Sequence, residues 1–169
     1  MSEINQILVK ELKKRNLKIA SAESLTGGLI SKKITEISGA SEIFECGICS
    51  YSNQIKNQIL GVRKETLEKF TEYSEQTAEE MAEGVRKLAK ADIGIATTGI
   101  AGPTGGTEEK PVGTVYIGIS STLGTWAVRF DLGAESRNDR ETIREISAIK
   151  ALELALKTAE KFDEISIVK

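Results

Sequence analysis

Ser24 is the residue whose surroundings point most directly to covalent chemistry. It lies in Glu23-Ser-Leu-Thr-Gly-Gly28, where a short buried strand is expected to turn into a helix. A serine there projects from the helix start, while the N–H groups of Thr26, Gly27 and Gly28 face a phosphate or a developing oxyanion. Because serine is also a favoured N-cap residue, a purely structural role for Ser24 is the alternative.

A serine nucleophile needs a base, and the chain contains no histidine. Ser-His-Asp catalysis, Cys-His catalysis and histidine-containing metal sites are therefore excluded. A lysine kept neutral by burial is the main remaining base. Lys56, in Tyr51-Ser-Asn-Gln-Ile-Lys56, follows the second expected strand and would reach the same crevice. Its alternative is an ordinary solvated helix lysine.

The segment 97–113 is the second candidate for binding, because it is rich in glycine and holds both prolines of the chain. Glycines allow the backbone to approach a ligand closely. Neither the G-x-x-x-x-G-K-[ST] phosphate loop nor G-x-G-x-x-G is present, which disfavours a nucleoside triphosphate site. The alternative is a connecting loop without a functional role, although long unstructured loops are usually functional or disordered.

Composition narrows the class of protein. The 169 residues carry a formal net charge of −2 with a pI of about 5.5, which gives no attraction to nucleic acid or anionic lipid. No apolar stretch is long enough to span a membrane and the start has no secretion pattern, so we expect a cytoplasmic protein. Cys46 and Cys49 are spaced as C-x-x-C, but the other ligands of a zinc site are missing. We expect both thiols to be buried and structural.

The elements that must position these residues follow from apolar periodicity and turn residues. Helices are expected over 2–15 with a Ser2 cap, from Leu29 to a stop at Gly39, over 55–60, around Leu67, over 74–90, and from near Ser136 with Asp139 in capping-box position. Strands are expected over 17–21, 43–52, 92–98, 114–120 and 125–132, the last two forming a hairpin and one antiparallel pair. The fold class is therefore α/β, a single three-layer α/β/α domain over residues 1–169 with a mixed, mostly parallel sheet of about five strands.

Two helix faces are expected to be buried. The helix over 74–90 should bury Ala78, Met81, Ala82, Val85, Leu88 and Ala89. The last helix should bury Ile146, Ile149, Leu152, Leu156 and Ala159.

The chain resembles the CinA C-terminal domain family, whose characterised members are nicotinamide mononucleotide deamidases. The resemblance covers nearly the whole chain and rests on six ordered motifs. They are Ala22-Glu-Ser-Leu-Thr-Gly-Gly28, Tyr51-Ser-Asn-Gln-Ile-Lys56 with Leu60-Gly-Val62, Thr98-Gly-Ile-Ala-Gly-Pro103, Gly105-Gly-Thr107, Lys110-Pro-Val-Gly-Thr-Val115, and Asp139-Arg-Glu-Thr-Ile-Arg144. Two departures stand out: family members usually have cysteine where this chain has Leu25, and longer members carry an additional N-terminal domain.

The resemblance implies a Ser–Lys amidohydrolase that converts nicotinamide mononucleotide to nicotinic acid mononucleotide and ammonia. Ser24 would attack the carboxamide carbon, Lys56 would take the hydroxyl proton, and Tyr51 would orient these groups or relay the proton. The N–H groups around Thr26, Gly27 and Gly28, or those of Thr98 and Gly99, would form the oxyanion hole. The glycine loop, with Gly102, and the helix face of Arg140 and Arg144 would bind the rest of the substrate, the arginines at its phosphate. Ion pairing of these arginines with Glu141 or Glu145 is the alternative.

The resemblance further implies a homo-oligomer that needs no metal and no cofactor, with a small-molecule nucleotide as its partner. Two other readings stay open. One is a non-catalytic nucleotide-binding module, or a competence-related interaction module, with the same fold. The other is a hydrolase of the same mechanism acting on a different amide, because substrate choice depends on pocket shape.

Overall fold

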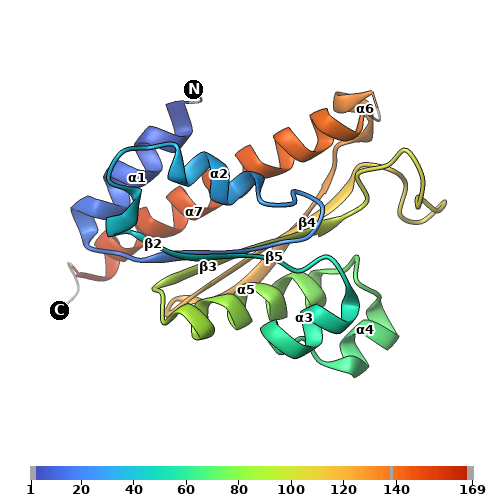
Figure 1. The fold of residues 1–169 in the computed structure, drawn as a ribbon, viewed down its shortest axis with the longest axis horizontal. Helices are drawn as coiled ribbons and strands as arrows, with labels where there is room; N and C mark the ends of the chain where they lie inside the picture. The colour runs from blue at the N-terminus through green and yellow to red at the C-terminus, as the bar shows by residue number, and fades with distance from the viewer. Residues whose placement is uncertain (1–2, 138, 167–169) are drawn as a thin grey trace.

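The computed structural model describes residues 3–137 and 139–166, with side chains described through residue 163. A five-stranded sheet lies between two layers of helices (Figure 1). The strands are β1 (Ile19–Glu23), β2 (Phe44–Cys49), β3 (Ile93–Gly99), β4 (Thr114–Ser121) and β5 (Gly124–Asp131), in the order β2-β1-β3-β4-β5. One face is covered by α1 (Glu3–Arg15), α2 (Leu29–Thr35) and α7 (Arg140–Ser166), the other by α3 (Asn53–Leu60), α4 (Lys64–Phe70) and α5 (Glu75–Ala89). The expected α/β fold with three layers is confirmed.

The sheet is mixed, with β4 running against the other strands. β1 pairs in parallel with β2 and with β3, whereas β3–β4 and β4–β5 are antiparallel. The sequence predicted the β4–β5 hairpin but only one antiparallel pair. The second arises because segment 100–113 contains no helix that could carry the chain back across the sheet, so β4 returns directly beside β3.

The core has two parts, one on each face of the sheet. Between the sheet and α1, α2 and α7 lie apolar side chains that include Leu8, Ile30, Ile95 and Leu152. On the other face α5 packs so closely that a Cβ at Gly94 would lie 2.2 Å from Ala82 O, and one at Gly118 would lie 2.1 Å from Ala78 O. The two glycines let the backbone of α5 rest on β3 and β4.

The helix ends follow local chemistry, with one correction. Ser74 Oγ accepts from Thr77 N at the start of α5, and Gly61 ends α3 in the left-handed conformation. The expectation that the last helix starts near Ser136 is wrong. Ser136 ends the short helix α6 (Gly133–Ser136), and Asp139 itself caps α7 by accepting from Thr142 N at 2.8 Å. The predicted Ser2 cap lies outside the described residues.

Some side chains predicted to be buried are not. Leu88 is 55% exposed, because α5 turns it away from the sheet. On α7, Ile146, Ile149 and Leu156 are only half-buried, whereas Leu152 and Ala159 are buried as expected. The buried face of α7 is rotated toward its small residues, which include Ala148, Ala151 and Ala155, and it packs against α1 and β3. The apolar pattern of α7 predicted the wrong face because it gave weight to the large side chains, whereas the alanines that form the buried face contribute little to such a pattern.

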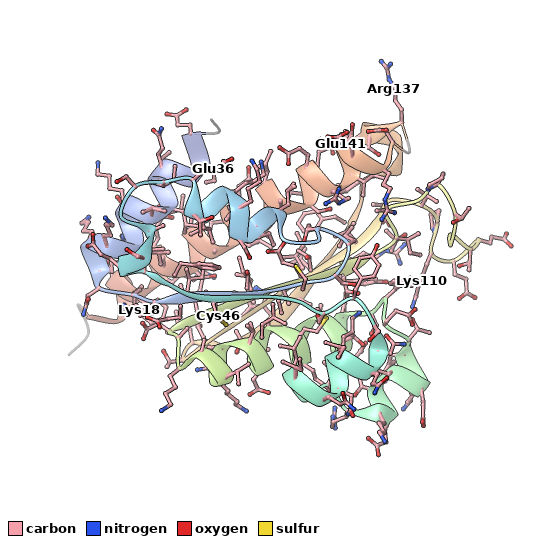
Figure 2. All side chains as sticks on the ribbon, in the orientation of Figure 1. Lys18, Glu36, Cys46, Lys110, Arg137 and Glu141 are labelled. Carbon is pink, nitrogen blue, oxygen red and sulfur yellow. The ribbon has the colours of Figure 1, made fainter. Side chains whose placement is uncertain are left out.

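Both thiols lie on β2, an edge strand of the sheet. Cys46 is half-buried on the α5 side of the sheet (Figure 2), and Cys49 is exposed. The expectation that both thiols are buried is therefore wrong, since an edge strand is covered less completely than a central one. Within the described residues no cluster of three or more His, Cys, Asp or Glu side chains is arranged to hold a metal ion. Nor is any helix in the described ranges both long and apolar enough to cross a membrane.

Candidate active site

The carboxyl ends of three parallel strands bring the predicted catalytic residues together. Ser24 follows β1, Tyr51 follows β2, and Gly99 ends β3, so all three lie at the same edge of the sheet. Open α/β sheets commonly bind ligands at this edge. The glycine-rich segment 100–113 leaves the sheet there as well, at the right of Figure 1.

Ser24 and Lys56 are in direct contact. Lys56 Nζ donates to Ser24 Oγ at 3.2 Å and to Ser50 O at 3.0 Å. Ser24 is held by its own backbone, whose N–H donates to Thr97 O at 2.9 Å and whose carbonyl accepts from Gly27 N at 3.2 Å. Lys56 projects inward from α3, which begins after the N-cap residue Ser52. The predicted pair is thus assembled from segments 32 residues apart.

Burial disfavours the charged form of the Lys56 amine. Lys56 is 1% exposed, and this desolvation lowers the pKa of its ammonium group below the usual 10.5. The negative charge of Glu72 acts in the opposite direction and raises the same pKa. The hydrogen-bond partners of Nζ are a hydroxyl and a carbonyl rather than a carboxylate, so no directly bonded anion stabilises the charged form.

Glu23 is a residue that the sequence reasoning missed. Its side chain is fully buried directly before Ser24, and its carboxylate satisfies the first turn of α2. Oε2 accepts from Thr26 Oγ1 at 2.8 Å, Gly28 N at 2.9 Å and Ile30 N at 3.0 Å, while Oε1 accepts from Ser31 N at 2.9 Å and Ser31 Oγ at 2.7 Å. The carboxylate therefore fixes the turn that carries Ser24, at the end of a helix where negative charge is favoured.

A pocket of about 350 Å³ opens beside the Ser24–Lys56 pair. Its walls come from the turn after β1, the start of α3, the turn between α4 and α5, the glycine-rich segment and the first residue of α7. The lining residues are Ser24, Leu25, Tyr51, Ser52, Asn53, Lys56, Glu72, Tyr73, Gly99, Ile100, Ala101, Gly102, Thr104 and Arg140. Of the predicted site residues, Thr26, Gly27, Gly28, Thr98 and Arg144 do not line it.

Arg140 and Tyr51 bridge one side of the pocket. Arg140 Nη2 donates to Tyr51 Oη at 3.0 Å, and Nη1 donates to Gly102 O at 2.6 Å. Tyr51 is 66% exposed, and among the described residues its hydroxyl bonds Arg140 rather than Ser24 or Lys56. Tyr51 thus lies at the pocket wall, and its hydroxyl forms no hydrogen bond with the Ser24–Lys56 pair.

Arg144 acts on the Ser24 turn from behind. Its Nε donates to Leu25 O at 3.1 Å and its Nη2 to Thr26 O at 2.9 Å. These bonds satisfy carbonyls that follow the serine, and they leave the guanidinium outside the pocket lining. The two arginines, four residues apart on α7, therefore lie at different positions, with Arg140 lining the pocket and Arg144 bonded to the backbone that follows Ser24.

Some backbone N–H groups near Ser24 already donate to acceptors within the protein, and others do not. Gly27 N bonds Ser24 O and Gly28 N bonds Glu23, so neither is available to a ligand. Because Ile100 N donates to Thr114 O, alternation in the antiparallel pair directs Thr98 N toward β4 and Gly99 N away from it. Among the described residues, no acceptor is recorded for the N–H groups of Leu25, Thr26 and Gly99, and of these three residues Leu25 and Gly99 line the pocket.

The glycine-rich segment is anchored at both ends of its course. A Cβ at Gly99 would lie 2.5 Å from Thr114 O and 2.8 Å from the Cα of Val115, so only glycine fits there. Further along, Lys110 Nζ donates to Tyr73 O at 2.6 Å, which ties the segment to the turn before α5. Figure 2 shows Lys110 at this end of the molecule, far from Lys18 at the opposite end.

Comparison with known proteins agrees with this architecture. The family model described as the CinA C-terminal domain matches residues 1–159. A Thermoanaerobacter sp. (strain X514) protein named "Putative competence-damage inducible protein" is 51% identical over 152 residues, and a "CinA-like protein" of Kosmotoga olearia is 49% identical over 150 residues. These alignments cover 90% and 89% of this chain but 36% and 35% of the relatives, so the chain spans about a third of their length.

Solved structures resemble the chain over nearly all of its length. The competence/damage inducible protein CihA from Agrobacterium tumefaciens superposes with a TM-score of 0.86 at 36% identity, covering 93% of this chain and 97% of that one. A CinA superfamily protein from Klebsiella pneumoniae superposes with a TM-score of 0.87 at 28% identity, covering 94% and 97%.

Proposed function

This chain belongs to the CinA C-terminal domain family, and from that premise and the geometry of the pocket we propose that it is a Ser–Lys amidohydrolase. Its proposed substrate is nicotinamide mononucleotide, which it converts to nicotinic acid mononucleotide and ammonia. One observation carries the proposal: a lysine amine, 1% exposed, lies 3.2 Å from the hydroxyl of Ser24 at the floor of an open pocket. A surface lysine paired with a capping serine would have neither the burial nor the pocket.

In the proposed reaction Ser24 Oγ bonds to the carboxamide carbon while its proton passes to Lys56 Nζ. The carbonyl oxygen becomes an oxyanion, for which the free N–H groups of Leu25 and Gly99 are the candidate donors. When the carbon–nitrogen bond breaks, Lys56 returns the proton to the leaving nitrogen and ammonia departs, leaving an ester on Ser24. Water then attacks the ester with Lys56 as base, which releases the carboxylate product and restores the serine.

The remaining residues would bind and hold the substrate. Arg140, the one arginine of the described lining, would face the 5′-phosphate with its remaining donors. Tyr51 would contribute its ring and hydroxyl at the same wall. Thr26, Gly27, Gly28, Thr98 and Arg144 would position the Ser24 turn and the end of β3 rather than touch the substrate, since none of them lines the pocket.

The test is ammonia release from nicotinamide mononucleotide by the purified chain, beside Ser24→Ala and Lys56→Ala. Matched controls are Ser41→Ala and Lys14→Ala, which alter exposed residues away from the pocket. We expect wild type and both controls to be active, and the two site variants to lose at least about a thousandfold in kcat, as when a catalytic serine or its base is removed. Equal activity of all five proteins would refute the site. Binding of the nucleotide without turnover by wild type would favour a nucleotide-binding module of the same fold.

A further inference from the structure

The pocket holds one carboxylate that the proposed mechanism does not use. Glu72 lies in the turn between α4 and α5, half-buried, and is the one acidic side chain among the described lining residues. Its backbone is held in place because Glu72 O accepts from Thr98 Oγ1 at 2.6 Å. Its Oε2 accepts a long hydrogen bond of 3.4 Å from Asn53 Nδ2. The side chain is thus presented to the pocket by a fixed backbone.

This carboxylate has no cationic side chain bound to it. Within the described residues, none of the salt bridges includes Glu72, although its charge is felt by Lys56 and by the phenol of Tyr73, whose pKa it helps to raise. A half-buried carboxylate without a cation is a poor neighbour for a base that must be neutral, because it favours the protonated lysine. A cationic ligand would supply the missing partner.

We propose that Glu72 determines specificity by selecting amides carried on a permanently cationic, N-substituted pyridinium ring. The inference rests on the proposed function and names the chemical feature that the same site would recognise. In nicotinamide mononucleotide the ring nitrogen forms the bond to ribose and carries a positive charge, whereas the phosphate is negative. One pocket that contains Glu72 and Arg140 offers one group of each sign to such a zwitterion.

Aromatic side chains strengthen the preference for a cationic ring. Tyr51 and Tyr73 line the same pocket as Glu72, with Tyr51 shortly before α3 and Tyr73 shortly before α5 in the chain. The faces of aromatic rings attract cations, and they also stack on a flat pyridinium ring. A neutral amide of the same shape would gain the stacking but not the charge interactions.

Binding of the cation would also prepare the base. The titratable and charged groups that line the pocket with Lys56 are Glu72, Tyr51, Tyr73 and Arg140, and Glu72 is the one acidic side chain among them. Lys110 lies beside the same turn, where its Nζ donates to Tyr73 O and to Thr71 Oγ1 but forms no salt bridge with Glu72. A pyridinium ring against Glu72 would neutralise that anion and repel the protonated amine. Both effects favour the neutral form of Lys56 when the correct substrate is bound.

The experiment measures binding in the Ser24→Ala background, where no turnover occurs. The probes are N1-methylnicotinamide, which is cationic, and nicotinamide, which carries the same amide on a neutral ring. Nicotinamide mononucleotide and its reduced dihydro form, whose ring is neutral, make a second pair. We expect the cationic member of each pair to bind about tenfold more tightly, and Glu72→Gln to reduce the preference to about threefold or less. The control Glu75→Gln removes the same charge from an exposed position outside the pocket and should change nothing.

A second measurement uses the active enzyme. Glu72→Gln should move the acidic limb of kcat/KM to lower pH, because the anion that favours protonated Lys56 is gone. An unchanged cation preference in a folded Glu72→Gln variant would overturn the inference, as would the absence of any preference or of any binding in the Ser24→Ala background. Turnover of nicotinamide mononucleotide with unchanged preference would refute the role of Glu72 alone. A Glu72-dependent preference without ammonia release by wild type would refute the proposed reaction instead.

Discussion

Replacing Glu23 with glutamine tests whether a buried carboxylate holds the turn that carries Ser24 in place. Glutamine keeps the shape of glutamate but presents one oxygen and one NH2 group. If its oxygen takes the place of Oε2, Ser31 N–H faces the NH2 group and loses its acceptor. In the reverse orientation Gly28 N–H and Ile30 N–H both lose theirs. The hydroxyls of Ser21 and Ser31, which donate to Glu23 Oε1 at 3.4 and 2.7 Å, can rotate and accept from the NH2 group, but a backbone N–H cannot.

The expected loss follows from these contacts. One buried donor left unsatisfied costs about 1–3 kcal/mol, and hydrogen bonds to a charged acceptor are worth about 1.5–3 kcal/mol against about 1 kcal/mol for neutral ones. One orphaned N–H and three bonds that lose their charge assistance together lower the free energy of unfolding by about 3–5 kcal/mol. Breaking other buried ionic interactions costs about the same. Because small domains have about 5–15 kcal/mol in total, most of the variant should still be folded at 25 °C.

Urea unfolding measures the free energy of unfolding, and ammonia release measures kcat. The matched control is Glu36→Gln, where an exposed glutamate paired with Lys32 loses its charge and stability should change by less than about 0.5 kcal/mol. We expect Glu23→Gln also to lower kcat by about tenfold or more under conditions where it is folded, because the Ser24 turn shifts. A loss of less than about 1 kcal/mol with an unchanged urea dependence would refute the positioning role.

Three further predictions follow from single contacts. Gly99→Ala should lower the melting temperature and reduce the free energy of unfolding by about 2 kcal/mol or more, since its Cβ would overlap backbone atoms of Thr114 and Val115. The control Gly61→Ala, with open space around the added Cβ, should reduce the free energy of unfolding by about 1 kcal/mol. Equal melting temperatures of the two variants would contradict the packing argument. Burial lowers the pKa of Lys56 in the folded protein, so between that pKa and about 10.5 the unfolded state binds more protons and the free energy of unfolding should rise with pH. Lys56→Met should abolish this rise. The value of kcat/KM should fall as the pH drops through the folded pKa of Lys56, and a flat pH profile would exclude Lys56 as the base. Arg144→Ala should reduce kcat about tenfold with KM within about twofold, because Arg144 bonds Leu25 O and Thr26 O; a change confined to KM would instead place Arg144 against the substrate.

The order of elements could be predicted because each carries a local signal. Ser52 and Gly61 bracket α3, and Ser74 opens the strongly amphipathic α5. The crevice could be predicted as well, because parallel strands end at one edge, and that rule placed the turns after β1 and β2 beside each other. What remained beyond local reasoning was which lysine reached Ser24, and the resemblance to a family supplied that assignment.

The role of Glu23 was missed although its signal was present. The strand before it, Ile19–Ala22, is built of small and apolar residues, so an acidic residue that continues the strand must be buried and must find donors. The first turn of a helix offers such donors in its free N–H groups. Thr26 and Ser31, which follow Glu23 in the chain, add hydroxyl groups that donate to the same carboxylate. A carboxylate directly before a glycine turn and a helix is therefore a positioning signal that can be read from sequence.

The different contacts of the two arginines of α7 could not be predicted from the sequence. Arg140 and Arg144 lie on one helix face, and the sequence assigned both to the substrate phosphate. Their different contacts depend on where the Ser24 turn lies along α7, which is set by tertiary packing and not by local sequence. Arg144 meets the carbonyls of Leu25 and Thr26, and Arg140, about 6 Å further along the axis, meets Tyr51 and Gly102 instead.

The antiparallel return of β4 gives the pocket its second wall. Had segment 100–113 crossed over to a parallel strand, it would have left the edge where β1, β2 and β3 end. Because β4 starts beside Gly99 and runs back through the centre of the molecule, the segment must stay at that edge, where Lys110 ties it to Tyr73. The glycines are required for that course, since β3 and β4 approach too closely at Gly99 for any side chain. The mixed topology of the sheet thus encloses the buried amine of Lys56 in a pocket rather than leaving it on an open edge.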